Sequence, residues 1–258
     1  RMNVSARGDR IGQVNGLAYS AVGGSIMQIE AVLRPSRQGN ANEEDFRLKV
    51  TGNLGKVMDE STEAALSAAL DHIIAKVGRL PDKNSYLIHV NTVEGAVPKD
   101  GPSAGAAITT AMVSLLTDTP IHCDVAMTGA ISGNGDVLPI GGLPEKLDGA
   151  VQDGAKTVLI PHDNIADLND VPSSIKNKLT IIAVKNIEEV LEHALTAPLL
   201  KQSTPTPQVS GQPAPAKTKP ATTPAVSQNS PTNDNKDTPD SGSKKAAPYP
   251  MFQMKLDM

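Results

Sequence analysis

The stretch Pro98-Lys99-Asp100-Gly101-Pro102-Ser103-Ala104-Gly105 joins a polar loop to a long apolar segment with helical spacing. The apolar positions from Ala104 to Leu116 predict a buried helix. Ser103 is therefore placed at a helix N-terminus, where backbone N–H groups lack partners within the helix and favour negative charge. Such a position suits a nucleophile, but serine and proline also begin many helices that carry no chemistry. The octapeptide alone leaves both interpretations open.

The chain before this loop has the spacing of a hairpin, a strand, a helix and another strand. Alternating apolar and polar residues over 11–20 and 25–33, around Val22-Gly23-Gly24, predict the hairpin. A strand is predicted over 46–50, followed by a turn at 52–55, and a further strand over 85–90. Between them the helical spacing covers 58–77, with Ser61 as its expected cap and Gly78 just past its end.

The chain after the helix alternates between strand and helix patterns. Strands are predicted over 125–128, 136–140, 157–160 and 179–184, and helical segments over 143–152, 164–168 and 187–195. The segment Ser132-Gly133-Asn134-Gly135 is a strong turn signal between the first two strands. This order predicts an α/β or α+β fold with a mixed sheet flanked by helices. We find no internal repeat.

Composition divides the chain into a folded part and a tail. Ten of the twenty prolines lie in 201–258, a segment otherwise rich in Thr, Ser, Ala, Asn and Lys. Such a segment buries too little apolar surface to offset its ordering entropy, so we expect a disordered tail over 199–258. The remaining residues are enough for one core, which predicts an N-terminal linker over 1–10 and a single domain over 11–198.

Charge and cysteine content narrow the classes of function. Residues 1–200 have a formal net charge of −7, so we expect no nucleic-acid partner. The single cysteine, Cys123, allows no intrachain disulfide, which fits a reducing compartment such as the cytoplasm. No apolar run approaches the ~18 residues of a membrane span, and the N-terminus lacks a signal-peptide pattern, so no membrane association is expected.

A nucleophilic serine needs a base, and histidines are the first candidates. Residues 101–105 fit G-x-S-x-G, the nucleophile elbow of α/β-hydrolases, with Asp148 or Asp163 and His162 or His193 downstream. That elbow requires a strand running directly into the serine, whereas 94–101 is a polar loop. An esterase of this type stays an alternative, but none of the five histidines has a supporting motif.

Lys146 is the stronger candidate for the base. It follows the Gly141-Gly142 break near a helix start, so it can point back toward the strand ends. To be neutral near pH 7 its pKa must fall by roughly 3 units from a reference of ~10.4, and burial is the usual cause of such a fall. The hydroxyl of Thr128 is placed to hold the amine. An ordinary solvated lysine beside Glu145 is the alternative.

These segments together resemble the C-terminal proteolytic domain of Lon proteases, ATP-dependent AAA+ enzymes that use a Ser–Lys dyad. The resemblance spans about residues 11–197 and is most specific at the octapeptide. The other matching segments are Gly16-Leu17-Ala18, Val22-Gly23-Gly24, residues 52–61, Glu94-Gly95-Ala96, Ala126-Met127-Thr128-Gly129 and residues 137–146.

The resemblance implies a mechanism and a set of partners. Ser103 is expected to be the nucleophile and Lys146, 43 residues later, the general base. The supporting residues implied are Thr128, which holds the lysine amine, Gly101 and Pro102 in the segment 101–103 whose backbone N–H groups form the oxyanion hole, Asp100 in a loop that switches between open and blocking forms, and Glu94. No cofactor or metal is expected in this domain; ATP and Mg²⁺ belong to an ATPase domain, and the chain has no G-x-x-x-x-G-K-[ST] motif of its own.

By the same resemblance we expect a piece of a longer protease that assembles as a hexamer and degrades unfolded polypeptides. The cytoplasm is the expected compartment, with the mitochondrial matrix as the alternative. The chain also departs from the family pattern: Ala130 stands in place of a glutamate and Tyr19 in place of a tryptophan, and further differences occur at Asn91, Val93 and Pro144. The alternative function is therefore a degenerate relative that serves as a scaffold or binding module.

Overall fold

The computed structural model describes residues 4–35, 47–53, 55–78, 80, 86–93 and 101–200, which lie in a compact unit spanning 1–205. Asp100, Glu94 and the predicted tail from residue 201 onward lie outside the described residues. Within the described residues, no helix has both the length and the apolar character that crossing a membrane requires.

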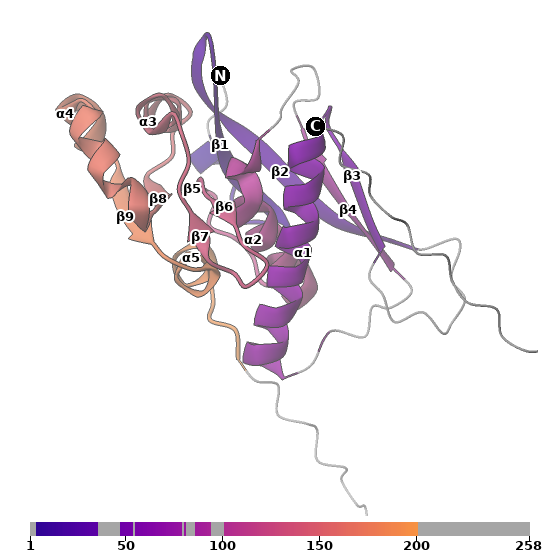
Figure 1. Cartoon of the computed structure of the whole chain (residues 1–258). Coiled ribbons are helices and arrows are strands. Elements are labelled where there is room, and N and C mark those ends of the chain that lie inside the picture. The colour runs from indigo at the N-terminus through magenta and orange to yellow at the C-terminus, as the bar shows by residue number, and fades with distance from the viewer. Residues whose placement is uncertain are drawn as a thin grey trace, which may run out of the picture. The chain divides into compact units, whose positions relative to one another are not determined.

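The centre of the domain is a seven-stranded mixed sheet in the order β3-β4-β2-β1-β5-β8-β9 (Figure 1). Strands β1 and β2 form the predicted antiparallel hairpin, and β1, β5, β8 and β9 run parallel to one another. The strands of this sheet are β1 (Gln13–Ser20), β2 (Gly23–Pro35), β3 (Arg47–Thr51), β4 (Tyr86–Thr92), β5 (Val125–Met127), β8 (Thr157–Pro161) and β9 (Thr180–Val184). The sequence-based expectation of a mixed sheet is confirmed.

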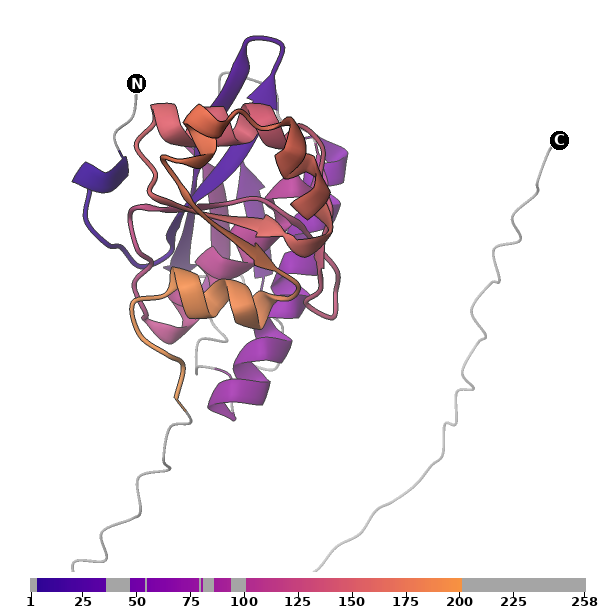
Figure 2. The same ribbon diagram turned by 90° about the vertical axis from the view of Figure 1, so that its left-hand side faces the viewer.

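Helices cover both faces of the sheet. The α-helices are α1 (Lys56–Val77), α2 (Gly105–Thr117), α3 (Leu143–Gln152), α4 (Ser173–Lys176) and α5 (Ile187–Ala194), and the 3₁₀ helices are η1 (Val4–Ala6), η2 (Pro102–Ala104) and η3 (His162–Asp170). Successive strand residues point to opposite faces, so Val125 and Met127 join the core under α1, α2 and α5, whereas Ala126 joins the core under α3. The turn between β1 and β2 projects beyond the rest of the domain (Figures 1 and 2).

Helix α1 begins two residues before the predicted start, with Gly55 at its N-cap position. The prediction of Ser61 as the cap was wrong, because this residue is buried within the helix. Its hydroxyl instead donates a 3.4 Å hydrogen bond to the carbonyl of Pro102. The predicted end is confirmed: Gly78 has a φ of 87°, a left-handed conformation that glycine adopts without strain.

The strand predicted over 136–140 is shorter in the structure. β7 covers Val137–Leu138 and pairs with β6 (Ala130–Ile131), a strand that the sequence did not predict. Pro139 follows β7 at once and has no backbone N–H to continue the ladder. The turn between the two strands is present as predicted, with the N–H of Gly135 donating to the carbonyl of Ser132 at 2.9 Å.

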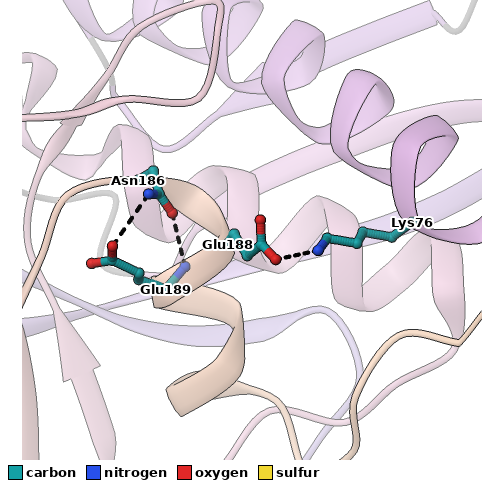
Figure 3. A network of polar contacts seen from close by, with 4 residues as sticks. All are labelled: Lys76, Asn186, Glu188 and Glu189. Atoms are coloured by element: carbon teal, nitrogen blue, oxygen red, sulfur yellow. Dashed lines mark hydrogen bonds and ion pairs between the residues drawn. The ribbon is translucent and has the colours of Figure 1, made fainter.

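Helix α5 closes the domain against α1, as Figure 3 shows. Its cap is Asn186, whose side chain accepts from the backbone N–H of Glu189 at 3.0 Å. Glu188 forms an ion pair with Lys76 of α1, and both side chains are partly exposed, so this pair contributes little to stability. The apolar face of α5, which includes Val190 and Leu191, is buried and provides most of the attachment.

Part of the segment predicted as a linker contacts the domain. Val4 is buried in the core under α3, and its N–H donates to the carbonyl of Asp153 at 3.1 Å. Arg10 forms an antiparallel bridge with Ile121. These contacts fix the chain as it enters β1.

Candidate active site

The candidate site lies where β1 and β5 end. These strands run parallel, with Asn15 opposite Ala126 and Gly16 opposite Met127, so their carboxyl ends meet at one edge of the sheet. Tyr19 is near the end of β1, and Thr128 directly follows β5. Ligands of open α/β sheets bind outside the carboxyl ends of the strands, and of the predicted residues Ser103, Thr128 and Lys146 gather at this edge.

Ser103 is half-buried in η2, at the head of α2, which agrees with its predicted position at a helix start. Its carbonyl accepts hydrogen bonds from the backbone N–H of Gly129 at 2.9 Å and from the hydroxyl of Thr128 at 3.3 Å. The N–H of Ala106 donates to the carbonyl of Gly129 at 3.0 Å. The main chain of the serine is therefore anchored to the end of β5, and its side chain is left for the pocket.

Gly105, two residues after the serine, allows the start of α2 to lie close to the chain that follows β5. A Cβ atom on Gly105 would lie 2.8 Å from the backbone nitrogen of Ile131, closer than real Cβ atoms come to backbone. The two glycines of the Gly-Pro-Ser-Ala-Gly motif thus have different surroundings, since no described atom lies within 4 Å of a Cβ placed on Gly101. Position 105 requires glycine because β6 packs directly against it.

Lys146 enters the site from the opposite face of the sheet. It lies in the first turn of α3 and is only 1% exposed, among the most buried side chains described. Its Nζ donates to the hydroxyl oxygen of Thr128 at 3.1 Å. Because the single proton of that hydroxyl points to the carbonyl of Ser103, the oxygen is left to accept from the amine. Thr128 thereby links the lysine to the serine loop.

Burial lowers the pKa of Lys146 from 10.5 to about 8. At pH 7 roughly a tenth of the molecules then have a neutral amine, against fewer than one in a thousand for a solvated lysine. When neutral, the amine can donate to Thr128 and still present a lone pair. The lysine is therefore adapted to accept a proton near neutral pH.

Ser103 and Lys146 line the same open pocket of about 410 Å³, a size that accepts a small ligand or a few residues of a peptide. Its described lining consists of Tyr19, Gly101, Pro102, Ser103, Pro139, Ile140, Gly141 and Lys146. Pro102 has no N–H, so Gly101 and Ser103 are the lining residues of that loop whose main chain can donate to a ligand. The pocket is mostly apolar, with the two reactive groups on its wall.

Residues 1–197 match the profile described as the Lon protease (S16) C-terminal proteolytic domain. The chain belongs to the Lon protease family. This membership indicates a peptidase and confirms the resemblance that the octapeptide suggested.

Individual Lon proteases are similar over the same region. The chain is 46% identical to the Lon protease of Rickettsia bellii over 193 residues, which is 75% of this chain and 24% of the relative. It is 48% identical to that of Rhizobium meliloti over 195 residues, 76% of this chain and 23% of the relative. The chain spans about a quarter of the length of the Lon proteases that it matches.

The remaining residues predicted from the Lon resemblance have different outcomes. Asp100 and Glu94 lie outside the described residues. Ala130 is buried in β6, and no buried side-chain nitrogen or oxygen of the described part lacks a hydrogen-bond partner. The absence of the glutamate usual in Lon therefore leaves no described side-chain donor unpaired.

The histidines do not join the site. None of His72, His89, His122, His162 and His193 is among the described residues that line the pocket. His162 and His193, the bases that an α/β-hydrolase elbow would use, are exposed. Among the described residues that line the pocket with Ser103, the basic side chain is Lys146 and not a histidine.

Two contributors were missed as site residues by the sequence analysis. Tyr19 was noted only as a departure from the Lon pattern, yet its ring lies over the Lys146 amine, 5.7 Å from the ring centroid to Nζ. Asn164 is buried and holds the main chain of Ile140, accepting from its N–H at 3.0 Å and donating to its carbonyl at 2.8 Å. No local pattern marks either residue, because each acts through a partner distant in the sequence.

Proposed function

We propose that this chain is the proteolytic domain of a serine endopeptidase that uses Ser103 as nucleophile and Lys146 as general base. One observation carries the proposal: a buried lysine with a lowered pKa is bound, through Thr128, to the loop of a serine that lines the same pocket. A scaffold has no need to bury an amine in this way, since burial of its charged form opposes folding.

The reaction follows from these groups. The neutral amine of Lys146 takes the proton of the Ser103 hydroxyl as Oγ attacks the scissile carbonyl. The backbone N–H groups of Gly101 and Ser103 stabilise the resulting oxyanion. The Lys146 ammonium then returns the proton to the departing amine, which leaves an acyl ester on Ser103. Water, deprotonated by the same amine, hydrolyses this ester and restores the hydroxyl.

For the longer protein we propose the arrangement that its relatives' size and family suggest. The domain works as part of a hexamer whose AAA+ ATPase domain, with ATP and Mg²⁺, delivers unfolded polypeptides. The cytoplasm is the proposed compartment, with the mitochondrial matrix as the alternative. This domain itself holds the peptide and the two catalytic side chains.

Covalent labelling tests the proposed chemistry. A fluorophosphonate is expected to modify Ser103, and the modified residue is identified by mass spectrometry of the full-length protein. Labelling requires the neutral lysine, so its rate should rise with pH through a midpoint near 8, the pKa of Lys146, and be about tenfold lower at pH 7 than at its plateau.

The same experiment separates the alternatives. A midpoint between pH 6 and 7 would indicate a histidine base, as in the esterase alternative. Failure of Ser103 to react at any pH, in a protein that also cleaves no unfolded substrate with ATP present, would leave the scaffold as the better account.

Thr128→Val is expected to lower kcat by about ten- to a hundredfold with little change in KM. Valine keeps the volume but removes the oxygen that accepts from Lys146 and the proton donated to Ser103. Thr128→Ser keeps both bonds and should restore most of the rate. Steady-state cleavage of a fluorogenic peptide measures the two variants, and equal rates for them would contradict the assigned role.

A further inference from the structure

The Lys146 amine lies below an aromatic ring as well as beside a hydroxyl. Its Nζ is 5.7 Å from the centroid of the Tyr19 ring, within the ~6 Å range of a cation–π contact. The two residues come from different elements, β1 and α3, and 127 positions of sequence separate them. Both line the same pocket. The contact between Tyr19 and Lys146 therefore belongs to the candidate active site.

Close packing at two glycines, Gly24 and Gly142, holds the Tyr19 ring in this place. Tyr19 pairs with Gly24 across the hairpin, and a Cβ on Gly24 would lie 1.8 Å from the carbonyl oxygen of Glu145. The hairpin is therefore pressed against the first turn of α3. On the other side, a Cβ on Gly142 would lie 2.7 Å from two carbon atoms of the Tyr19 ring. The ring thus occupies the space that glycine leaves at the start of the helix bearing Lys146.

We propose that Tyr19 is a positioning residue for the base: its ring stabilises the ammonium that forms when Lys146 takes the proton of Ser103. The proposal rests on the proposed Ser–Lys function. The negative face of an aromatic ring attracts a cation, and here the ring of Tyr19, which is 54% exposed, lies over the buried Lys146 amine. A neutral amine gains little from the same ring, so the contact strengthens as the proton moves.

No described charged group competes with the ring for this role. Burial is the cause of the lowered pKa of Lys146, with no carboxylate or ammonium among its causes. From the sheet the amine contacts Tyr19 and Thr128, and Ser103 of η2 lines the same pocket. On its own helix, Glu145 is exposed and Asp148 accepts a hydrogen bond from Gln152. The Tyr19 ring and the Thr128 oxygen, which accepts a hydrogen bond from Nζ, are the described groups that favour the charged form.

The test is a direct titration of Lys146 in the full-length protein. Acetic anhydride acylates neutral amines, so the fraction of acetylated Lys146 measured by mass spectrometry at each pH gives its midpoint. Tyr19→Leu should lower this midpoint by about half a pH unit or more, because leucine fills space but offers no π face. Tyr19→Phe keeps the ring and should keep the wild-type midpoint.

A matched control uses the same hairpin. Val22→Ala, at the fully exposed turn, should not move the midpoint. An unchanged or higher midpoint in Tyr19→Leu overturns the proposal, as does a Phe variant that shifts as far as the Leu variant. If Tyr19 only lines the pocket and has no electrostatic role, the Tyr19→Leu midpoint should be unchanged or higher.

Hydrolysis separates this proposal from the function on which it rests. The acidic limb of kcat/KM for an unfolded substrate should move to lower pH in Tyr19→Leu, in step with the acetylation midpoint. If the wild type hydrolyses nothing, the proposed function fails, while acetylation still reports whether the ring acts on Lys146. If the wild type is active and the midpoint does not move, the role of Tyr19 alone is wrong.

Discussion

Ser103→Ala and Lys146→Met are each expected to reduce peptide hydrolysis by three orders of magnitude or more, because each removes one member of a unit that acts together. The main chain of Ser103 makes the anchoring hydrogen bonds to Thr128 and Gly129, so the alanine variant keeps them. Cleavage of a fluorogenic peptide at saturating concentration measures the loss.

The two variants should differ in stability, which distinguishes the base from the nucleophile. Below pH 8 the folded protein carries a buried ammonium whose pKa is about 8, against 10.5 when solvated. The unfolded chain therefore binds the proton more tightly, which costs the fold about 3 kcal/mol at pH 7 and less as the pH rises toward 10.5. Methionine removes this cost and loses one hydrogen bond to Thr128.

Lys146→Met should consequently unfold at a temperature equal to or above that of the wild type at pH 7. Ser103→Ala should stay close to the wild type. Lys156→Met is the matched control, since its side chain is 70% exposed, and both its activity and its stability should be unchanged. Full activity in Lys146→Met together with loss of activity in a histidine variant would refute the dyad.

Gly24→Ala is expected to destabilise the domain by about 3 kcal/mol and to abolish hydrolysis. The added Cβ would lie 1.8 Å from the carbonyl oxygen of Glu145 and 2.5 Å from its carbonyl carbon. Both are backbone atoms of α3, so no side chain can turn aside and the helix itself must move. Since α3 carries Lys146, this movement separates the amine from Thr128.

Chemical denaturation and peptide cleavage measure these two effects together. Gly133→Ala serves as the control, because a Cβ there meets nothing within 4 Å, and it should change neither stability nor rate. A Gly24→Ala protein with wild-type stability would show that the hairpin and α3 are not held as closely as the structure indicates.

The sequence was most informative about features that depend on neighbouring residues, such as helix ends and turns. Helical spacing placed Ser103 at the head of a helix and gave α3 its bounds of Leu143–Gln152, which the structure repeats. The glycine turn between β1 and β2 and the end of α1 at Gly78 also follow from local residue preferences. The pairing of Ser103 with Lys146 came from the family resemblance, because spacing alone does not bring two helices together.

The features that were missed depend on tertiary contacts. Ser61 resembles a helix cap in sequence, but its hydroxyl lies inside the domain, against the carbonyl of Pro102. The role of Tyr19 depends on the packing of β1 against α3. The role of Asn164 depends on the contact of η3 with the loop that contains Ile140. The strand pair β6–β7 is too short to give a periodic pattern. Each case requires knowing which distant segment lies opposite.

The site is divided between the two faces of the sheet, and under the proposed Ser–Lys mechanism this division determines when the site becomes complete. Ser103 enters above β5 with α2, whereas Lys146 enters from the other side with α3, and Thr128 joins them only at the strand end. Ribosomal synthesis delivers the serine 43 residues before the lysine. By the proposed mechanism, a growing or partly unfolded chain in which α3 has not yet packed on the sheet therefore holds a serine without its base.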